Sequence, residues 1–324
     1  MTVGELCDIY LSAVEKGLIR GKRRRPKKAS TIATDRGRIE RHIKPLLGSR
    51  KVRDLAQHDV NKFIRDVASG KTATDVRTKP RGRARVTGGR GTASRTVGLL
   101  GGILSYAVSE GVIETNPARG AERFEDNRRA VRLTPSQYRD LGRALVSAES
   151  EGQNKSAIEI AWLICLSGCR RGEAVGLQPA EIDKRQNVLN LIDSKEGTSI
   201  RPIGTAPMDR LKKLNIKGGY MFPATGNKKP YGGFPKAWQR IVRRAEMPEI
   251  TPHVLRHSFA SEAHDLGFSE PTIAALLGHH SGSTTRGYIH HVDSALIMAA
   301  DSVSRHILGM MLGRPSVTPS GIRE

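Results

Sequence analysis

The segment that most constrains the fold is residues 251–292, which reads TPHVLRHSFASEAHDLGFSEPTIAALLGHHSGSTTRGYIHHV. Thr251-Pro252 combines an N-cap residue with a proline suited to the first helical turn, so a helix is predicted to begin there. Gly267 is typical of a helix end. Ser269-Glu270-Pro271 then predicts a second short helix, which ends at Gly278.

Polar side chains gather at the ends of these two predicted helices. His253 and Arg256 lie one turn apart on the same helix face, His279 follows the second helix, and Tyr288 follows a polar turn. An arginine fork binds phosphate oxygens bidentately, and a histidine transfers protons near neutral pH. A tyrosine hydroxyl, with a pKa near ~10, becomes a nucleophile when cations assist it. These groups suit attack on a phosphodiester without a metal or other cofactor.

The charge of the chain favours a polyanionic partner. Its 324 residues carry a formal net charge of +22, with a pI near 10.4. Nucleic acid is the simplest partner for such a field, and a merely solvated basic surface is the alternative. Aromatic residues make up only 4% of the chain. Because single strands and RNA loops are bound by stacking on aromatic side chains, duplex DNA is the better prediction.

Membrane and secretory signals are not visible. No apolar run reaches the ~20 residues of a membrane span, and the first residues form an amphipathic helix pattern rather than a signal peptide. The three cysteines, Cys7, Cys165 and Cys169, do not form a disulfide pattern, and buried thiols are favoured over metal ligands. We therefore expect a protein of the reducing cytoplasm.

Residues 1–122 are expected to form a helical DNA-binding domain with basic loops. Apolar periodicity predicts helices near the N-terminus, across residues 31–47, across 55–67 and across 93–109. The stretch at residues 19–30 is interpreted as an arm laid on phosphates, or as a solvated segment when DNA is absent. Its candidate contacts are Arg23, Arg24, Arg25, Lys27 and Lys28. Residues 70–94, rich in Gly and Arg, are expected to be an insertion or flexible loop that can bind phosphates but has no stable fold.

Residues 123–133 are polar and are interpreted as a linker. Thr134-Pro135 with Gln137 forms a capping box, which predicts the first helix of a second domain at 134–312. Residues 313–324 are expected to be a disordered tail. Further along, strands are predicted at 188–192 and 200–203, joined by a turn that holds Lys195.

The motifs HVLR, LLGHH and GYIHH resemble the catalytic boxes of the tyrosine recombinases, the phage integrase family. The upstream segment SGCRRGEAVGL resembles the first arginine box of that family, with Arg170 as the phosphate ligand and Glu173 as a supporting residue. The resemblance implies that Lys195 is the catalytic lysine of a β-hairpin. It also implies catalytic roles for His253, Arg256, His279 and Tyr288.

The resemblance implies a mainly α fold. A helical core-binding domain would precede a mixed α/β catalytic domain with a small antiparallel sheet. The reaction would be site-specific recombination of duplex DNA through a 3′-phosphotyrosyl link, carried out by a homotetramer. Arg240 and Arg243 are predicted to face the DNA. The resemblance leaves room for an accessory DNA-bending protein, and it leaves the target site and the type of mobile element undefined.

Other interpretations of these residues stay open. Arg170 could simply pair with Glu173, Lys195 could be an ordinary turn lysine, and Tyr288 could be a core tyrosine. His253 and His257 are four residues apart, as in some zinc sites, although a neighbouring arginine would repel a cation.

Two further functions, and two positions for the C-terminal helix, also stay open. The chain could be a type IB-like topoisomerase or a catalytically inactive DNA-binding regulator. The apolar helix pattern at residues 294–312 is predicted to dock on a neighbouring protomer, with packing on its own domain as the alternative.

Overall fold

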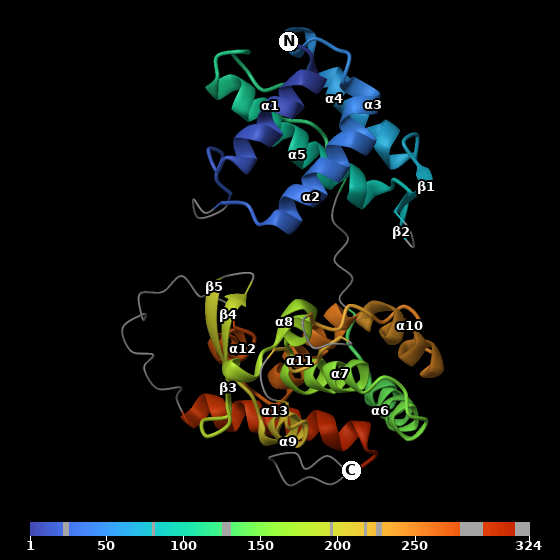
Figure 1. Ribbon diagram of the computed structural model, residues 1–324, viewed down its shortest axis with the longest axis vertical. Helices are drawn as coiled ribbons and strands as arrows, with labels where there is room; N and C mark the ends of the chain where they lie inside the picture. The colour runs from blue at the N-terminus through green and yellow to red at the C-terminus, as the bar shows by residue number, and fades with distance from the viewer. Residues whose placement is uncertain are drawn as a thin grey trace. The chain divides into compact units, whose positions relative to one another are not determined.

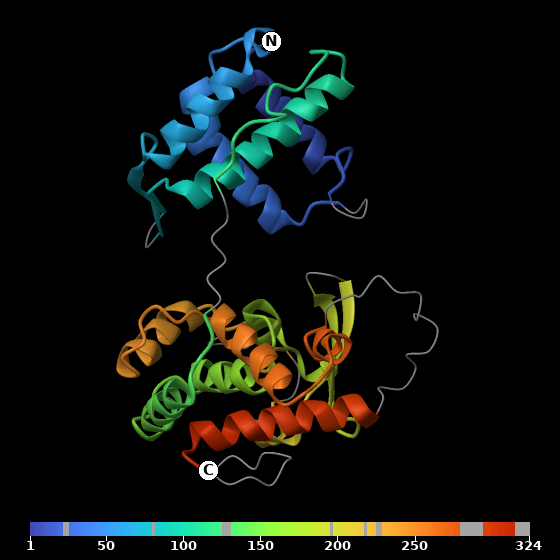
Figure 2. The ribbon, with the colours of Figure 1, turned by 180° about the vertical axis from the view of Figure 1, so that it is seen from behind.

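The chain folds into two compact units in the computed structural model, Met1–Arg128 and Arg129–Glu324 (Figures 1 and 2). The structure describes residues 1–21, 26–79, 82–124, 131–194, 197–216, 219–224, 229–278 and 294–314. In this part of the chain, no helix is both long and apolar enough to cross a membrane.

The N-terminal unit is a small helical bundle around one apolar core. Thr2 caps the first helix, and the carboxylate of Glu5 accepts a hydrogen bond from the Thr2 backbone N–H at 2.8 Å. The core joins residues of the segments 3–14, 39–55, 60–67 and 93–118, among them Leu6, Ile39 and Phe63. The helices are α1 (Val3–Glu15), α2 (Ala29–Arg38), a π turn (Ile39–Ile43), α3 (Lys44–Leu47), a 3₁₀ turn (Val52–Asp54), α4 (Gln57–Ala68) and α5 (Arg90–Ser109).

Residues 70–94 were expected to lack a stable fold, and that expectation is wrong. They contain an antiparallel hairpin of β1 (Thr74–Lys79) and β2 (Gly82–Val86), and α5 begins at Arg90. The Gly and Arg content hid a short alternation of β-branched and charged residues, which is the pattern of an exposed two-stranded ribbon.

The C-terminal unit contains a central helix bundle and a three-stranded sheet. The sheet has the order β3-β4-β5, and both of its strand pairs are antiparallel. Its helices are α6 (Pro135–Ser150), α7 (Lys155–Ser167), α8 (Arg171–Gly176), a 3₁₀ turn (Pro179–Glu181), α9 (Thr205–Lys213), α10 (Phe234–Arg244), α11 (Pro252–Asp265), α12 (Glu270–Leu276) and α13 (Ser294–Met311). Its strands are β3 (Ile182–Asp183), β4 (Val188–Ser194) and β5 (Gly197–Pro202).

Helix α7 forms the centre of this unit. It is apolar almost all round, as a helix in the middle of a core must be. Helices α6, α10, α11 and α13 pack around it (Figures 1 and 2). Trp162 of α7 and Trp238 of α10 are each 1% exposed. The predicted capping box at Thr134 and Gln137 begins α6, as expected. Because the surrounding helices bury α7, its C-terminal end is fixed in the interior. The residues that follow it form the candidate site.

The C-terminal helix α13 packs on its own unit. Val303 and Ile307 are fully buried, and Oδ1 of Asp301 accepts a hydrogen bond from the Thr205 backbone N–H at 2.8 Å. A Cβ on Gly142 would lie 1.9 Å from the carbonyl oxygen of Met311, so α6 and the end of α13 are in close contact. The structure therefore shows the second of the two arrangements considered above, and docking of this helix on a neighbouring protomer stays a prediction.

The predicted fold class is confirmed. The chain is mainly helical, and its sheets are small and antiparallel. The predicted hairpin around residues 188–203 is also present, as β4 and β5. Ile200 of β5 faces outward at 41% exposure, whereas the neighbouring Arg201 is buried. The apolar residue and the charged residue therefore occupy the faces opposite to those that hydropathy alone would assign.

Candidate active site

The turn that follows α7 presents Arg170. Helix α7 ends at Gly168, whose φ of 62° lies in the left-handed region that favours glycine. Arg170 then precedes α8, and the carboxylate of Glu173 accepts two hydrogen bonds from it. The Arg170 backbone N–H donates to Oε2 and the side-chain Nη1 donates to Oε1, each at 2.8 Å. Glu173 thus fixes both the backbone and the guanidinium of Arg170.

Arg201 lies on the other side of the same carboxylate. Its Nη2 is 3.0 Å from Oε2 of Glu173, and the side chain is 0% exposed. None of its three guanidinium nitrogens makes a well-formed hydrogen bond with a described residue, so the contact with Glu173 is an ion pair of poor hydrogen-bond geometry. A buried guanidinium with so few hydrogen bonds is costly for the fold.

Arg256 links the turn between α7 and Arg170 to the end of α12. It projects from α11 with 4% exposure. Its Nη1 donates to the carbonyl oxygen of Gly168 at 2.7 Å, and its Nη2 donates to that of Leu277 at 2.8 Å. These bonds hold two carbonyl groups at helix ends that would otherwise need other partners. Three segments distant in sequence therefore meet at one guanidinium.

The cluster as a whole is electropositive. It contains the charges of Arg170, Arg201 and Arg256 against the single carboxylate of Glu173, which gives 3 − 1 = +2. Burial, together with the charges of Arg201 and Arg170, lowers the pKa of Arg256 to about 10. Like charges held together in a partly buried site are stabilised by an anion, so the arrangement is suited to binding one.

Gly278 connects this cluster to the segment that follows α12. Its φ is 62°, and a Cβ there would lie 2.8 Å from both Nη2 of Arg201 and Oγ of Ser199. Only glycine therefore fits at this close approach of the chain to β5. The position of Arg201 and the path of the chain just before His279 are thus coupled sterically.

His253 and His257 both lie on α11 and are exposed. Their ring centroids are 4.4 Å apart with the rings edge to face. Among the described residues, no group of three or more His, Cys, Asp or Glu side chains is arranged to hold a metal ion. His253 shares its helix with Arg256, so one element supplies both side chains.

Several predicted site residues lie outside the described residues. These are Lys195, His279 and Tyr288 of the catalytic set, and Arg23, Arg24 and Arg25 of the basic stretch. The structure brings together Arg170, Glu173 and Arg256, which are three of the predicted residues.

The predicted DNA contacts divide into exposed and internally paired side chains. Arg240, Arg243 and Lys28 are exposed. Lys27 instead donates to Asp35 at 2.8 Å and to the Tyr10 hydroxyl at 3.0 Å. Burial lowers the pKa of Lys27, but these hydrogen bonds outweigh it and leave the pKa raised. Lys27 therefore anchors the start of α2 inside the N-terminal unit, which differs from the phosphate contact expected for it.

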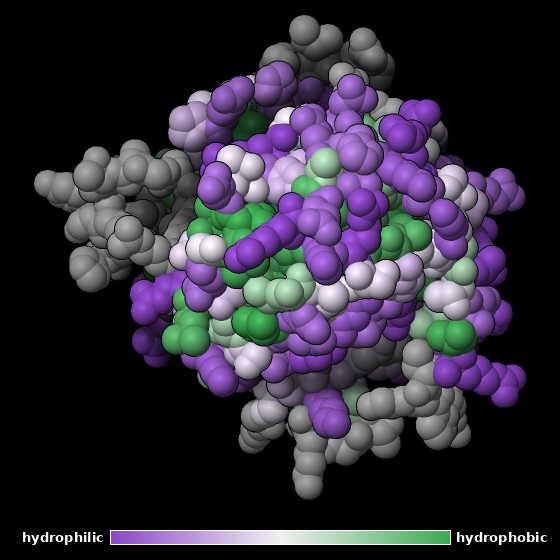
Figure 3. Space-filling model, turned by 90° about the horizontal axis from the view of Figure 1, so that it is seen from above, coloured by the Kyte–Doolittle hydropathy of each residue, from purple (hydrophilic) through white to green (hydrophobic). Residues whose placement is uncertain are grey.

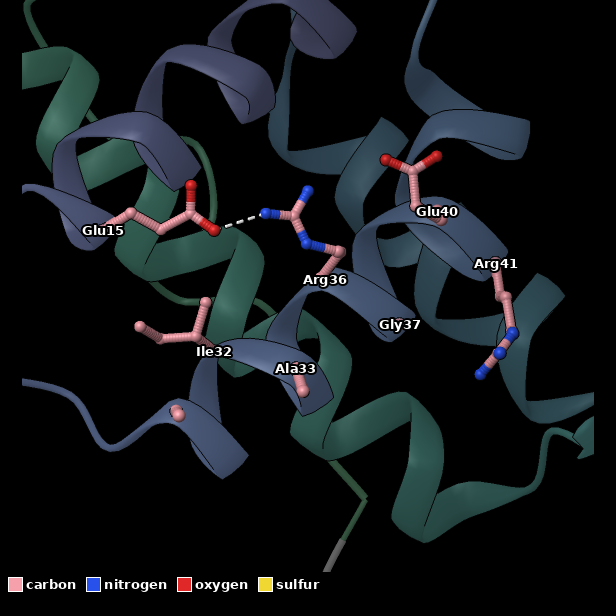
Figure 4. A pocket seen from close by; sticks show the side chains of 8 residues that line it. Glu15, Ile32, Ala33, Arg36, Gly37, Glu40 and Arg41 are labelled. Atoms are coloured by element: carbon pink, nitrogen blue, oxygen red, sulfur yellow. Dashed lines mark hydrogen bonds and ion pairs between the residues drawn. The ribbon is translucent and has the colours of Figure 1, made fainter. Parts of the chain in front are cut away.

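Two open hollows lie in the N-terminal unit, outside the unit that contains the arginine cluster. An open hollow between α1 and α2 is lined by Ile32, Ala33 and Gly37, and the ion pair of Arg36 with Glu15 spans it at 2.5 Å (Figure 4). It holds neither a nucleophile nor a cluster of cations. Hydrophilic side chains cover most of the face shown in Figure 3, with smaller apolar patches between them.

Arg201 is the site residue that sequence reasoning missed. The strand predicted at residues 200–203 contains it, but the motifs of the sequence assign it no role in the site. The signal lies in the strand register, because Arg201 pairs with Leu189 across the sheet and Leu189 is fully buried. Residues directly opposite on an antiparallel pair share a face, so an arginine there must point into the interior.

Comparisons with known proteins show which family the chain belongs to. The model of the phage integrase family matches residues 131–295, which is about half of the chain. Tyrosine recombinase XerC of Thermodesulfovibrio yellowstonii is 29% identical over 61% of this chain and 71% of its own length. Tyrosine recombinase XerD of Mycobacterium leprae is 27% identical over 80% of this chain and 86% of its own length.

A solved structure shows the same fold. A lambda integrase tetramer bound to a Holliday junction matches with a TM-score of 0.62 at 19% identity, over 88% of this chain and 79% of that one. The arginine cluster built from α8, β5 and α11 lies within the segment that the family model matches. The chain belongs to the phage integrase family, the tyrosine-type site-specific DNA recombinases.

Proposed function

We propose that this recombinase cuts and rejoins duplex DNA through a covalent 3′-phosphotyrosyl link at Tyr288. The observation that carries the proposal is the cluster of three guanidiniums around Glu173, with its net charge of 3 − 1 = +2. Phosphoryl transfer builds negative charge on the phosphate oxygens in the transition state, and fixed cations stabilise that charge without reorganisation.

Arg170 and Arg256 bind the nonbridging oxygens of the scissile phosphate in this proposal, and His279 donates a further hydrogen bond. The ion pair of Arg170 with Glu173 is compatible with this role, because a guanidinium has five N–H donors and can bind a carboxylate and a phosphate together. Glu173 and Arg201 do not touch the phosphate. They position Arg170.

The chemical step exchanges one phosphoester for another. The hydroxyl oxygen of Tyr288 forms a bond to phosphorus, and the bond from phosphorus to the 5′ oxygen of the DNA breaks. His253 accepts the tyrosine proton, and Lys195 gives a proton to the departing 5′ oxygen. Because the new bond is also a phosphoester, a 5′ hydroxyl from a second DNA strand reverses the step without ATP or a metal.

The two units divide the work on DNA. Residues 1–122 act as the core-binding domain, residues 123–133 as the linker and residues 134–312 as the catalytic domain. Arg23, Arg24, Arg25 and Lys28 contact phosphates from the first domain, and Arg240 and Arg243 do so from the second. Cys7, Cys165 and Cys169 are buried free thiols, which is compatible with a reducing cytoplasm.

We further propose that four copies act together on two DNA sites. The support is the lambda integrase neighbour, which was solved as a tetramer bound to a Holliday junction.

Plasmid assays separate this function from relaxation by a topoisomerase. The protein is incubated with two supercoiled plasmids that carry duplexes it has selected from a random-sequence pool, and with the same plasmids lacking them. Recombinant molecules formed only on the plasmids with the selected duplex support the proposal. Relaxation on both plasmids without recombinants contradicts it, and so does binding without any strand cleavage.

A further inference from the structure

The β1–β2 hairpin of the N-terminal unit contributes no side chain to the apolar core. No residue of either strand belongs to the apolar core of the unit, although the core resumes at Ala93. Arg77, Arg83 and Arg85 are exposed, and Val76 on the other face is 46% exposed. A two-stranded ribbon whose faces are exposed or only partly covered is marginally stable by itself. The hairpin is therefore not explained by a contribution to the stability of the unit.

The base of the hairpin, by contrast, is firmly attached. Gly70 and Gly88 both have positive φ angles, of 82° and 76°. A Cβ on Gly88 would lie 2.5 Å from the carbonyl oxygen of Val67 in α4, so the two chain segments touch there. The buried His42 ring contacts Oγ1 of Thr72 at 2.5 Å through Nδ1. The strands thus extend from a fixed base rather than from an unattached loop.

The strand register sorts the charges onto one face. Asp75 pairs with Arg85, and Arg77 pairs with Arg83. Directly opposed residues share a face, so three arginines and one carboxylate lie together while Val76 and Ala84 occupy the other face. Nε and Nη2 of Arg83 both donate to the Asp75 carboxylate at 2.6 Å. The face keeps a net charge of 3 − 1 = +2, and the opposed pair of Arg77 and Arg83 is unfavourable without an anion.

We propose that the β1–β2 ribbon enters the major groove of duplex DNA beside the sequence held by the N-terminal unit, with Arg77, Arg83 and Arg85 toward the DNA. The width of the ribbon selects the major groove over the minor groove. Paired strands about 4.8 Å apart, with side chains, fit the major groove of about 12 Å and not the minor groove of about 6 Å. The same face of a second copy is a poor partner, because it carries the same three arginines and single carboxylate.

The proposal rests on the DNA-recombining function proposed above and adds a contact to it. The test uses Arg77→Gln/Arg85→Gln, which keeps the pair of Arg83 with Asp75. The control is Lys16→Gln/Lys62→Gln, which removes the same charge from exposed residues of α4 and the C-terminal end of α1. The probe is a labelled duplex that the wild type has selected from a random-sequence pool. Circular dichroism melting checks that both variants are folded.

Two measurements decide the outcome. Dimethyl sulfate methylates guanine N7 in the major groove, so the wild type should protect guanines there and the hairpin variant should lose that protection. The Kd of the hairpin variant should rise about tenfold beyond that of the control, as expected for lost major-groove contacts. Equal protection and equal Kd in the hairpin variant and the control overturn the proposal.

The failure of this proposal can be told apart from failure of the proposed function. At saturating DNA the hairpin variant should still form the covalent protein–DNA complex, because Arg77 and Arg85 take no part in cleavage. If the wild type itself forms no covalent complex, the proposed cleavage function is wrong. The dimethyl sulfate footprint then still tests whether the hairpin contacts the major groove. If the ribbon instead binds another protein, the DNA footprint is unchanged and the groove assignment is overturned.

Discussion

Glu173 holds two arginines at once, and one of them, Arg201, is completely buried. One carboxylate oxygen accepts from Nη1 of Arg170 at 2.8 Å, and the other lies 3.0 Å from Nη2 of Arg201. The carboxylate is therefore fixed from both sides, and the direction of the Arg170 guanidinium depends on a residue that does not reach the surface. Arg201 is therefore expected to matter for the orientation of Arg170 more than for the free energy of unfolding.

Replacing Arg201 should therefore affect catalysis more than stability. In Arg201→Met, the free energy of unfolding should change by no more than about 1 kcal/mol, because the buried guanidinium makes few hydrogen bonds. The single-turnover cleavage rate should fall by about 100-fold, because Arg170 loses its alignment. Chemical denaturation and rapid-quench cleavage measure the two quantities.

Arg210→Met is the matched control. Arg210 forms a two-pronged pair with Glu159 away from the cluster, through Nε and Nη2 at 2.8 Å each. Its loss should lower the free energy of unfolding by about 1–3 kcal/mol and leave the cleavage rate of folded protein unchanged. If both variants lose stability and activity in parallel, the positioning role of Arg201 is wrong.

Gly278→Ala tests the steric coupling between Arg201 and the chain before His279. The new Cβ would lie 2.8 Å from Nη2 of Arg201, so that side chain must shift and cleavage should fall by at least tenfold. Gly267→Ala is the control, because Gly267 has a similar positive φ of 83° but nothing within 4 Å of its Cβ. Both variants should lose about 1–2 kcal/mol from backbone strain. Equal cleavage rates in the two variants would contradict the coupling.

Packing of α13 on its own unit predicts that Gly142→Ala destabilises the isolated protein. A Cβ there would overlap the Met311 carbonyl oxygen at 1.9 Å, so α6 and α13 must separate. The cost should be about 1–3 kcal/mol, typical of overpacking. Gly172→Ala, with open space around its Cβ, should be nearly neutral. A Gly142→Ala protein with wild-type melting but defective assembly on DNA would favour docking of α13 on a neighbouring copy.

The acid role of Lys195 predicts rescue by a better leaving group. Lys195→Ala should slow cleavage by about 10²–10⁴-fold on ordinary DNA. On a substrate whose 5′ bridging oxygen is replaced by sulfur, the rate should return toward wild type, because a thiolate leaves without a proton. Lys184→Ala, an exposed lysine near the other end of β4, should cleave both substrates normally. Unchanged impairment on the sulfur substrate would remove the acid role.

The sequence predicted most of the fold because its helix boundaries are marked by local chemistry. The Thr134 capping box and the glycine at position 267 mark helix ends without help from distant residues. The β1–β2 hairpin was missed because a solvated ribbon has no apolar periodicity. The side of the sheet that Arg201 faces was missed because it depends on pairing with Leu189 and on a carboxylate from another segment. The resemblance located Arg170 and Arg256, but only the fold shows their shared carboxylate and carbonyl partners.

The central claim is that this cationic cluster makes Tyr288 the nucleophile. The most direct measurement is mass spectrometry of the denaturation-resistant protein–DNA complex formed on a nicked duplex that the protein has selected. The account predicts a peptide that carries a nucleotide on Tyr288, and no complex from Tyr288→Phe, although that variant binds DNA with the Kd of the wild type. Tyr106→Phe, in the N-terminal unit, should form the complex normally. A covalent complex that persists in Tyr288→Phe, or a nucleotide attached to any other residue, would contradict the account.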